Sequence, residues 1–280
     1  LAALRISGPG EGSGIPARLV AGGAAIGGKV TAADLRTAPP PWREPLRASY
    51  GNSEILFAPT AAGEAAGRLW TAVPAETTFT TNPTLTLGGL SDALTKVYGR
   101  ANQVSANSGA TTFTVIDSAG LTVACLATMG QAFGARKLVP GTGILAATPL
   151  PDGITDAVAA IAINSVVAQS FAAAGASGGG AAASALVQTL AASLGEKVSA
   201  RQAIERPRLF RNGFDQTLWH EAGLDETFLR AARANGVNAS VVTGLARVSL
   251  IHCPGGMPRA PGTCRFEADP RAFGLGASAP

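Results

Sequence analysis

The stretch Ser108–Gly120, SGATTFTVIDSAG, does more than any other part of the sequence to decide the fold. Apolar and polar residues alternate from Thr111 onward, and the turn Ser118–Gly120 separates them from a second strand-like run, TVACLATM. Two alternating runs joined by a short turn predict a β-hairpin, in which Phe113 and Val115 share one strand face with Thr111. The hairpin begins with two threonines directly behind the polar segment ANQVSANSG, which we interpret as a connector.

Helical and strand patterns alternate in blocks along the rest of the chain. Helical spacing is found in IPARLVAGGAAIGG, TAAGEAAGRLWTAV, AAASALVQTLAASLG and DETFLRAARANGV, whereas SEILFA, AAIAINSVVAQ and QSFAAAGAS have the composition of strands. The stretch VVTGLARVSLIHC is predicted to be a further strand pair. Hairpins between helices favour antiparallel sheets sandwiched by helices over a doubly wound fold, so we expect an α+β protein.

Composition narrows the classes of function. The chain has 280 residues, 46% of them hydrophobic, and its net charge of +4 is spread over single arginines without interleaved aromatic residues, which argues against a nucleic-acid partner. The most apolar window, Ala157–Ala176, is interrupted by Asn164 and Gln169 and is too weak for a membrane span. Neither His220 nor His252 has a cysteine or carboxylate at metal-site spacing, so neither a metal nor an organic cofactor is expected.

Two of the three cysteines bracket one loop. Cys253 and Cys264 enclose PGGMPRAPGT, whose proline and glycine content would let the two ends meet. The spacing fits a disulfide, which would indicate an oxidising compartment, and it fits two unrelated thiols equally well. Cys125 lies in the second strand of the hairpin and is interpreted as a small core residue rather than a nucleophile.

The head of the hairpin offers a nucleophile that needs no histidine. With two histidines and no G-x-S-x-G motif, a Ser-His-Asp hydrolase is poorly supported. A threonine that becomes the first residue of a chain can use its own α-amine to accept the hydroxyl proton. Thr111 is placed to be released by peptide cleavage and then to act in this way.

The order of several segments resembles the gamma-glutamyltransferase family of N-terminal nucleophile hydrolases. The segments are GGKVTAADLRTAPPPWREPLRASYGN, APTAAG, TTFTVIDSAGLTVACLATMGQAFGARKLVPGTGIL, GASGGGAAASALVQTL, ARQAIERPRLF and EADPRAFG. Together they extend over essentially the whole chain. The resemblance implies an αββα sandwich of two antiparallel sheets between helix layers, incomplete at the N-terminus because family members carry a large further N-terminal portion.

The same resemblance implies a division of the chain and a reaction. Residues 1–110 correspond to the C-terminal part of the family's large subunit with its linker, and residues 111–280 to the small, catalytic subunit, the two forming one sandwich. Self-cleavage would give two pieces that stay together as a heterodimer. The implied substrates are small gamma-glutamyl compounds such as glutathione-like peptides, with transfer of the acyl group to water or an amine.

The nucleophile and its helper are carried over onto the hairpin. Thr111 is our preferred match to the catalytic threonine, with one residue fewer before Asp117 than in the family. A gapless match counted back from Asp117 instead puts Ala110 in the nucleophile position and Thr112 in that of a histidine, which would make the protein inactive. Thr128 matches a threonine whose hydroxyl assists the nucleophile, and we expect it to lie beside Thr111.

The remaining site residues come from the second half of the chain. Gly178 and Gly179 match the paired glycines whose backbone N–H groups form the oxyanion hole. Asp152 lies near the position of the carboxylate that holds the substrate amine, although its surroundings, TPLPDG, depart from the family pattern and also fit an exposed turn. The family's serine pair for the substrate carboxylate is replaced by AAIAINS, in which Asn164 and Ser165 are the candidate polar groups.

These departures leave a rival hypothesis. The family's arginine for the substrate carboxylate would lie upstream of Leu1, and Gly130 stands where a polar residue is common. The protein could accordingly be a non-catalytic relative, kept as a binding or structural module, or a truncated gene product. For an active member we expect a periplasmic or secreted location, with the cytoplasm as the alternative.

Overall fold

The structure is a computed structural model that describes residues 14–36, 42–73, 83–98, 109–148, 157–196, 198–211 and 216–278. The chain divides into two compact units. Unit 1 comprises residues 1–43 and 129–149, and unit 2 comprises residues 44–128 and 150–280. Among the described residues, no helix is both long and apolar enough to cross a membrane.

Unit 1 contains two helices, α2 (Ile15–Ala25) and α3 (Ala32–Arg36), and a small ribbon, β5 (Leu138–Val139) with β6 (Ile144–Leu145). Helix α2 approaches the ribbon closely at Gly22, where an added Cβ would lie 2.6 Å from the carbonyl oxygen of Pro140. Thr31 caps α3, since its hydroxyl accepts a hydrogen bond from the backbone N–H of Asp34 at 3.2 Å.

The centre of unit 2 is a six-stranded sheet in the order β1-β2-β7-β8-β12-β13, with every neighbouring pair antiparallel. The strands are β1 (Leu46–Tyr50), β2 (Ser53–Phe57), β7 (Ala157–Asn164), β8 (Gln169–Ser177), β12 (Arg247–Met257) and β13 (Arg265–Ala268). The segments AAIAINSVVAQ and QSFAAAGAS, predicted as strands, form β7 and β8, which pair with Ala157 opposite Ser177 and Asn164 opposite Gln169.

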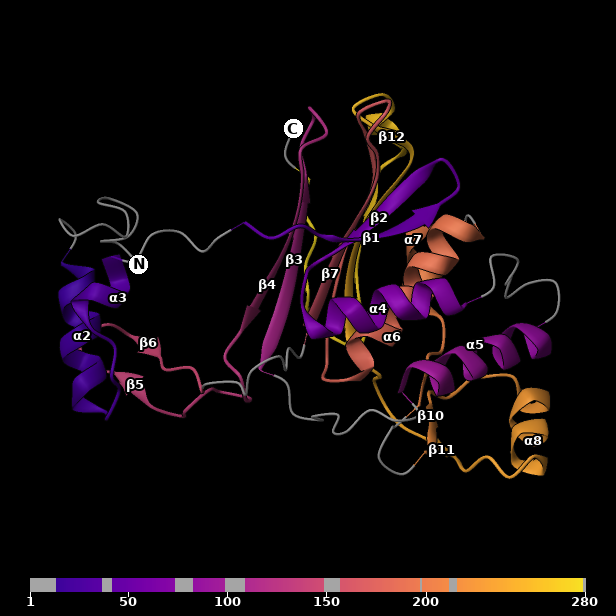
Figure 1. Ribbon diagram of the computed structural model, residues 1–280, viewed down its shortest axis with the longest axis horizontal. Coiled ribbons are helices and arrows are strands. Elements are labelled where there is room, and N and C mark those ends of the chain that lie inside the picture. The colour runs from indigo at the N-terminus through magenta and orange to yellow at the C-terminus, as the bar shows by residue number, and fades with distance from the viewer. Residues whose placement is uncertain are drawn as a thin grey trace. The chain divides into compact units, whose positions relative to one another are not determined.

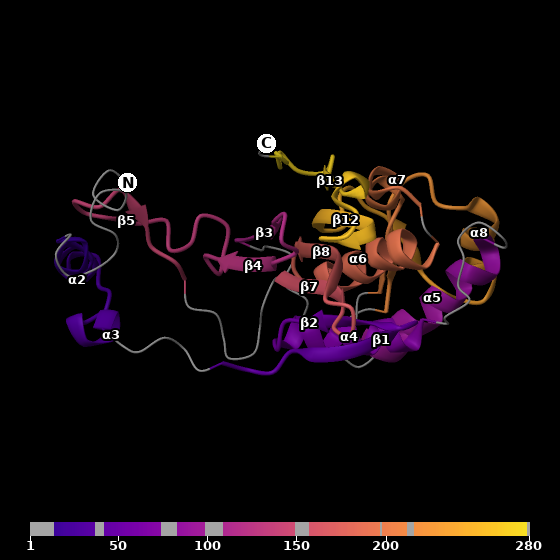
Figure 2. The same cartoon turned by 90° about the horizontal axis from the view of Figure 1, so that it is seen from above.

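A two-stranded sheet covers one face of this large sheet, as Figure 2 shows. It is the predicted hairpin, β3 (Ala110–Ile116) with β4 (Thr122–Thr128). Thr112 packs on Gly175 of β8 so closely that a Cβ on that glycine would lie 2.6 Å from the Thr112 Cβ. The outer face of the hairpin is open, because the side chains of Phe113 and Val115 are 53% and 52% exposed.

Helices pack on the opposite face of the large sheet (Figure 1). They are α4 (Ala61–Ala72), α6 (Ala181–Leu190) and α7 (Ala200–Glu205). Two further helices lie beyond them: α5 (Pro83–Tyr98) packs on α4 and β9, and α8 (Glu226–Ala234) packs on α5 and β11. All ten residues of α6 are buried, and its alanines allow close contact with α4 and with the alanine-rich strands. Its buried Gln188 side chain is satisfied, since the amide bonds to both the N–H and the C=O of Leu209. Unit 2 is therefore a layered α+β fold.

A buried ion-pair network fastens the end of the chain to the sheet. Arg208 is 1% exposed and donates from Nη2 to Asp269 at 2.7 Å, while Arg271 forms a bidentate pair with Glu221. Burial raises the pKa of Asp269, but attraction to Arg208 and hydrogen bonds from the backbone N–H groups of Arg271 and Val248 outweigh it and hold this pKa below its usual value. The network joins residues more than sixty positions apart.

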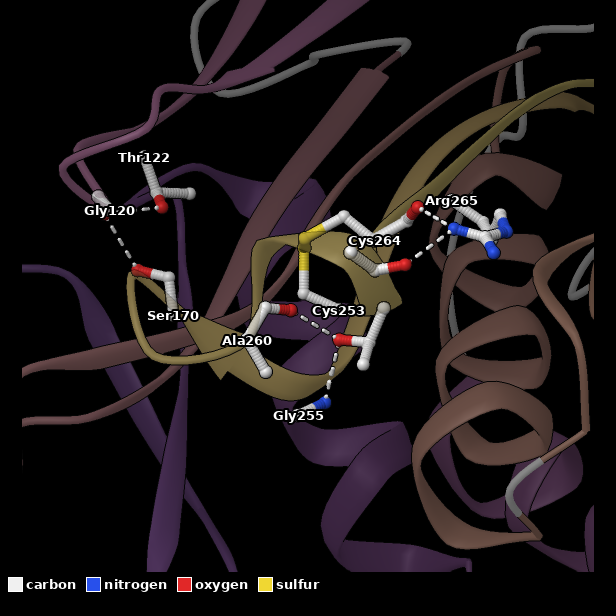
Figure 3. Close-up of a disulfide and its surroundings, with 10 residues drawn as sticks. Gly120, Thr122, Ser170, Cys253, Gly255, Ala260, Cys264 and Arg265 are labelled. Atoms are coloured by element: carbon white, nitrogen blue, oxygen red, sulfur yellow. Dashed lines mark hydrogen bonds between the residues drawn. A yellow bond between two sulfur atoms is a disulfide. The ribbon is translucent and has the colours of Figure 1, made fainter.

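The loop between β12 and β13 is closed by a disulfide (Figure 3). Of the two alternatives for these cysteines, the structure has the Cys253–Cys264 bond, with sulfurs 2.03 Å apart. The same loop contacts the turn of the β3–β4 hairpin, because a Cβ on Gly120 would lie 3.1 Å from the Met257 carbonyl oxygen. Ser170 donates a hydrogen bond to the Gly120 carbonyl at 3.0 Å, which anchors the turn from the other side.

One predicted strand pair is wrong. Residues 239–257 form β11 (Ala239–Val241) and β12, but the two strands belong to different sheets. β11 runs parallel to β10 (Leu218–His220) in a three-stranded sheet with β9 (Leu209–Arg211), whereas β12 pairs with β8 and β13. The two apolar runs are close in sequence, which suggested that they pair with each other. Instead, each run pairs with strands from other parts of the chain, because tertiary packing outweighs the local pattern.

Candidate active site

A pocket of about 450 Å³ lies at the head of β3. The strand residues Ala110–Thr114 form one wall, and Ser177, at the end of β8, lies on another. The edge of the large sheet and the chain after Asp269 complete it. The pocket is thus formed where the small sheet, the large sheet and the C-terminal segment come together.

The two faces of β3 place its first residues differently. Thr112 faces the large sheet, and its hydroxyl lies 3.1 Å from that of Ser249, so either can donate to the other. Thr111 points to the opposite, exposed face, together with Phe113 and Val115. The prediction that these three residues share a face is therefore confirmed.

The expected juxtaposition of Thr111 and Thr128 is corrected by the strand register. Thr128 lies directly opposite Ala110, and Thr111 lies opposite Ala127. Because side chains alternate between the two faces of a strand, Thr128 and Ala110 share one face and Thr111 lies on the other. The turn at residues 118–120 fixes this register, which the spacing of the threonines in the sequence could not determine.

The predicted oxyanion-hole glycines form the turn from β8 into α6. Gly178 has φ +134° and Gly179 has φ +70°, backbone conformations that residues other than glycine rarely adopt. A Cβ on Gly178 would also lie 2.5 Å from the Cα of Ala246. Since Gly178 directly follows the pocket residue Ser177, the turn presents the start of a helix near this end of the pocket.

The pocket carries charge at its rim. Arg247 is exposed. Glu267 forms an ion pair with Arg201, in which Oε1 of the glutamate lies 3.6 Å from Nε of the arginine. Asp269 is buried and engaged by Arg208, so it belongs to the structural network rather than to the open surface. Arg247 can therefore offer a positive charge to a substrate, while the hydroxyls of Thr112, Ser177 and Ser249 offer neutral hydrogen bonds.

The proposed substrate-binding pair lies elsewhere. Asn164 ends β7 and Ser165 begins the turn to β8, about 23 Å along the strand from Ala157, the residue opposite Ser177. The Asn164 amide is used structurally, donating to the Asn52 carbonyl and accepting from the backbone N–H of Val166. The prediction that these residues belong to the site is wrong, because they lie at the C-terminal end of β7, whereas the pocket residue Ser177 lies beside the N-terminal end of β7. Asp152 lies outside the described residues.

Three pocket residues were not predicted from the sequence. Ser177, Arg247 and Ser249 are brought together by the pairing of β8 with β12, in which Arg247 lies opposite Ser177. Their only local signal was the position of Ser177 directly before the three glycines. Within the described residues, no group of three or more His, Cys, Asp or Glu side chains could hold a metal ion.

Comparison with known proteins supports the architecture. No family model and no curated protein sequence matches the chain. Among solved structures, a mutant gamma-glutamyltranspeptidase from Helicobacter pylori matches with a TM-score of 0.51 and 15% identity, over 58% of this chain and 100% of that one. The Pseudomonas nitroreducens gamma-glutamyltranspeptidase bound to L-DON matches with a TM-score of 0.52 and 16% identity, over 61% and 100%.

A cephalosporin acylase from Bacillus halodurans matches over more of this chain. Its TM-score is 0.69 at 18% identity, covering 95% of this chain and 60% of the acylase. The present chain therefore spans about three fifths of the acylase's length. At such identities the matches concern the fold, which is that of the N-terminal nucleophile hydrolases, as the sequence resemblance implied.

Proposed function

We propose, starting from this N-terminal nucleophile hydrolase fold, that the protein is an acyl-transfer enzyme whose nucleophile is Thr111, set free as a new N-terminus. The proposal rests on one observation: the pocket at the head of β3 contains Thr111 and lies where β8 ends in the Gly178–Gly179 turn. A nucleophile and backbone N–H donors at one end of a sheet are the two parts that amide cleavage needs.

The activating step is a cleavage of the chain by itself. The Thr111 hydroxyl oxygen attacks the carbonyl carbon of Ala110, and the amide becomes an ester as the nitrogen takes up a proton. Water then hydrolyses the ester, leaving a carboxylate on Ala110 and a free α-amine on Thr111. The two pieces remain associated, because β2 of the first piece pairs with β7 of the second, and α4 packs on α6.

The amine then serves as the base for turnover. It accepts the Thr111 hydroxyl proton as the oxygen attacks the acyl carbonyl of the substrate, and the N–H groups of Gly178 and Gly179 hold the oxyanion, a contribution of about 3 kcal/mol per donor in such sites. The leaving amine takes the proton, and water or a second amine removes the acyl group. Gamma-glutamyl amides are the substrates to test first, with Arg247 available for a carboxylate of the acyl group.

Mass spectrometry of purified, aged protein tests the proposal. We expect two pieces, the smaller beginning at Thr111, and release of the chromophore from a gamma-glutamyl anilide. Thr111→Ala is expected to abolish both cleavage and turnover, whereas Thr227→Ala, the same change at an exposed position of α8 outside the pocket, leaves both intact. A wild-type chain that stays whole and releases no chromophore would refute the proposal.

A second candidate, a catalytically silent relative, is favoured by the strand register. Ala110 occupies the place directly opposite Thr128, while Thr111 lies on the exposed face. If Ala110 stands in the nucleophile position, Ala110→Thr should create self-cleavage before residue 110 and Thr111→Ala should change nothing. The position of the new N-terminus thus distinguishes the two candidates.

We also propose an oxidising location, periplasmic or secreted, for the protein. The Cys253–Cys264 disulfide supports it, since such bonds persist outside the reducing cytosol. Fractionation of cells carrying the full-length gene, followed by thiol labelling, tests this proposal.

A further inference from the structure

A second cavity lies on the helix-covered side of unit 2, away from the candidate active site. Its volume is about 280 Å³, and seven of the described residues line it: Tyr50, Ser53, Phe171, Ser193, Leu194, His252 and Pro254. None of these side chains is Lys, Arg, Asp or Glu. The pocket at the head of β3 shares no residue with this cavity.

His252 is a polar lining residue of this cavity whose imidazole has no hydrogen-bond partner among the described residues. The residue is 6% exposed, and its ring nitrogens are not among the described side-chain atoms that are both fully buried and unpartnered. A ring nitrogen that lines a cavity and has no protein partner can bind a water molecule or a polar group of a ligand. Burial also lowers the pKa of His252, so the ring is uncharged near pH 7 and has one nitrogen that accepts a hydrogen bond.

The walls of the cavity are aromatic and held in place. The Tyr50 hydroxyl donates to the Leu194 carbonyl, and the Tyr50 ring packs edge-on against Trp70. Leu194 belongs to a π-helical turn, Ala191–Gly195, that continues α6, a feature found frequently at functional sites. Pro254 follows Cys253, whose disulfide closes the adjoining loop.

From this arrangement we infer that the cavity binds a small uncharged aromatic molecule bearing a hydroxyl group, a phenol, whose O–H donates to the His252 imidazole. The rings of Tyr50 and Phe171 supply apolar contact for the aromatic ring. The volume is sufficient, since cavities of about 150 Å³ already hold benzene. The absence of a charged residue among the described lining residues selects against a carboxylate or an amine.

Histidine NMR of the full chain tests this inference, because the sequence has two histidines and thus gives two imidazole signals. His220 is the internal control: it is also buried, but its Nδ1 lies 3.0 Å from the Glu221 carbonyl oxygen and it does not line the cavity. On titration with phenol at pH 7.5, we expect the His252 signal to shift saturably while the His220 signal stays fixed. His252→Phe assigns the two signals.

Matched ligands isolate the hydrogen bond. Toluene has the shape of phenol without the donor and is expected to bind about tenfold more weakly, the usual effect of one hydrogen bond to a buried acceptor. Benzoate should not shift the His252 signal. In His252→Phe, calorimetry should give equal affinities for phenol and toluene.

Three results would overturn the inference. They are an unmoved His252 signal at saturating phenol concentrations, equal shifts of both histidine signals, and equal affinities of the wild-type protein for phenol and toluene. The wild-type comparison is sufficient by itself if the His252 variant does not fold.

Discussion

Replacing Asp269 by asparagine keeps the size of the side chain and removes one of the charges of the buried network. The carboxylate accepts four hydrogen bonds: from Arg208 Nη2 at 2.7 Å, from the Val248 N–H at 2.8 Å, and from the N–H and Nη1 of Arg271 at 3.0 and 3.1 Å. An asparagine amide would turn its NH₂ group toward two of these donors, and Arg208, which is 1% exposed, would lose its counter-charge.

The expected loss is a large part of the protein's stability. Breaking a buried ion pair by removing one partner costs about 3–5 kcal/mol, because the remaining charge stays in a low-dielectric environment. Domains are commonly stable by about 5–15 kcal/mol, so the variant should unfold at a clearly lower urea concentration.

Urea titration followed by tryptophan fluorescence measures this loss, since Trp70 and Trp219 both pack against the core of unit 2. Asp225→Asn is the matched control: Asp225 caps α8, and asparagine is an equally good N-cap, so its midpoint should hardly change. A loss below about 1 kcal/mol for Asp269→Asn would refute the reasoning, because the network would then contribute no more than an exposed pair.

The other predictions concern the same unit. Gly175→Ala should cost about 1–3 kcal/mol, because the new Cβ would lie 2.6 Å from the Cβ of Thr112 and push the hairpin off the sheet. Gly67→Ala, whose new Cβ finds its nearest atom at 3.7 Å within α4, should instead stabilise by up to about 1 kcal/mol, and urea midpoints compare the two. Thr60→Ala removes the side-chain cap of α4 and should lower stability by about 1 kcal/mol, measured in the same way. Because the pKa of Asp269 is held below its usual value, its contribution is present above about pH 4 and is lost as the pH falls through the lower folded value. Unfolding free energies of the wild type and of Asp269→Asn, measured from pH 6 to pH 2, should therefore converge, and parallel curves would contradict the assignment.

The sequence by itself determined the elements whose pattern is local. The alternation through residues 111–128 and the turn at Gly120 predicted the β3–β4 hairpin, and the residues after the three glycines predicted α6. The caps at Thr31 and Ser199 are interactions of the same local kind, since each side chain accepts a hydrogen bond from the backbone N–H three residues later. The order of these blocks also predicted the α+β class.

Only the tertiary structure decided which residues meet. Strand register placed Ala110, and not Thr111, opposite Thr128, and the length of β7 carried Asn164 to the far end of the sheet from Ser177. A single-residue change of register reverses the face of every side chain, and periodicity within one strand carries no information about its partner.

The pocket and the buried charges depend on the same kind of long-range pairing. β12 pairs with β8, which lies about seventy positions earlier in the sequence, and this pairing places Arg247 opposite Ser177. Asp269 reaches Arg208 because β13 pairs with β12. Local pattern specifies each strand and helix because backbone hydrogen bonding and side-chain alternation act between near neighbours. The site is specified by packing between distant segments, for which the sequence contains no local signal.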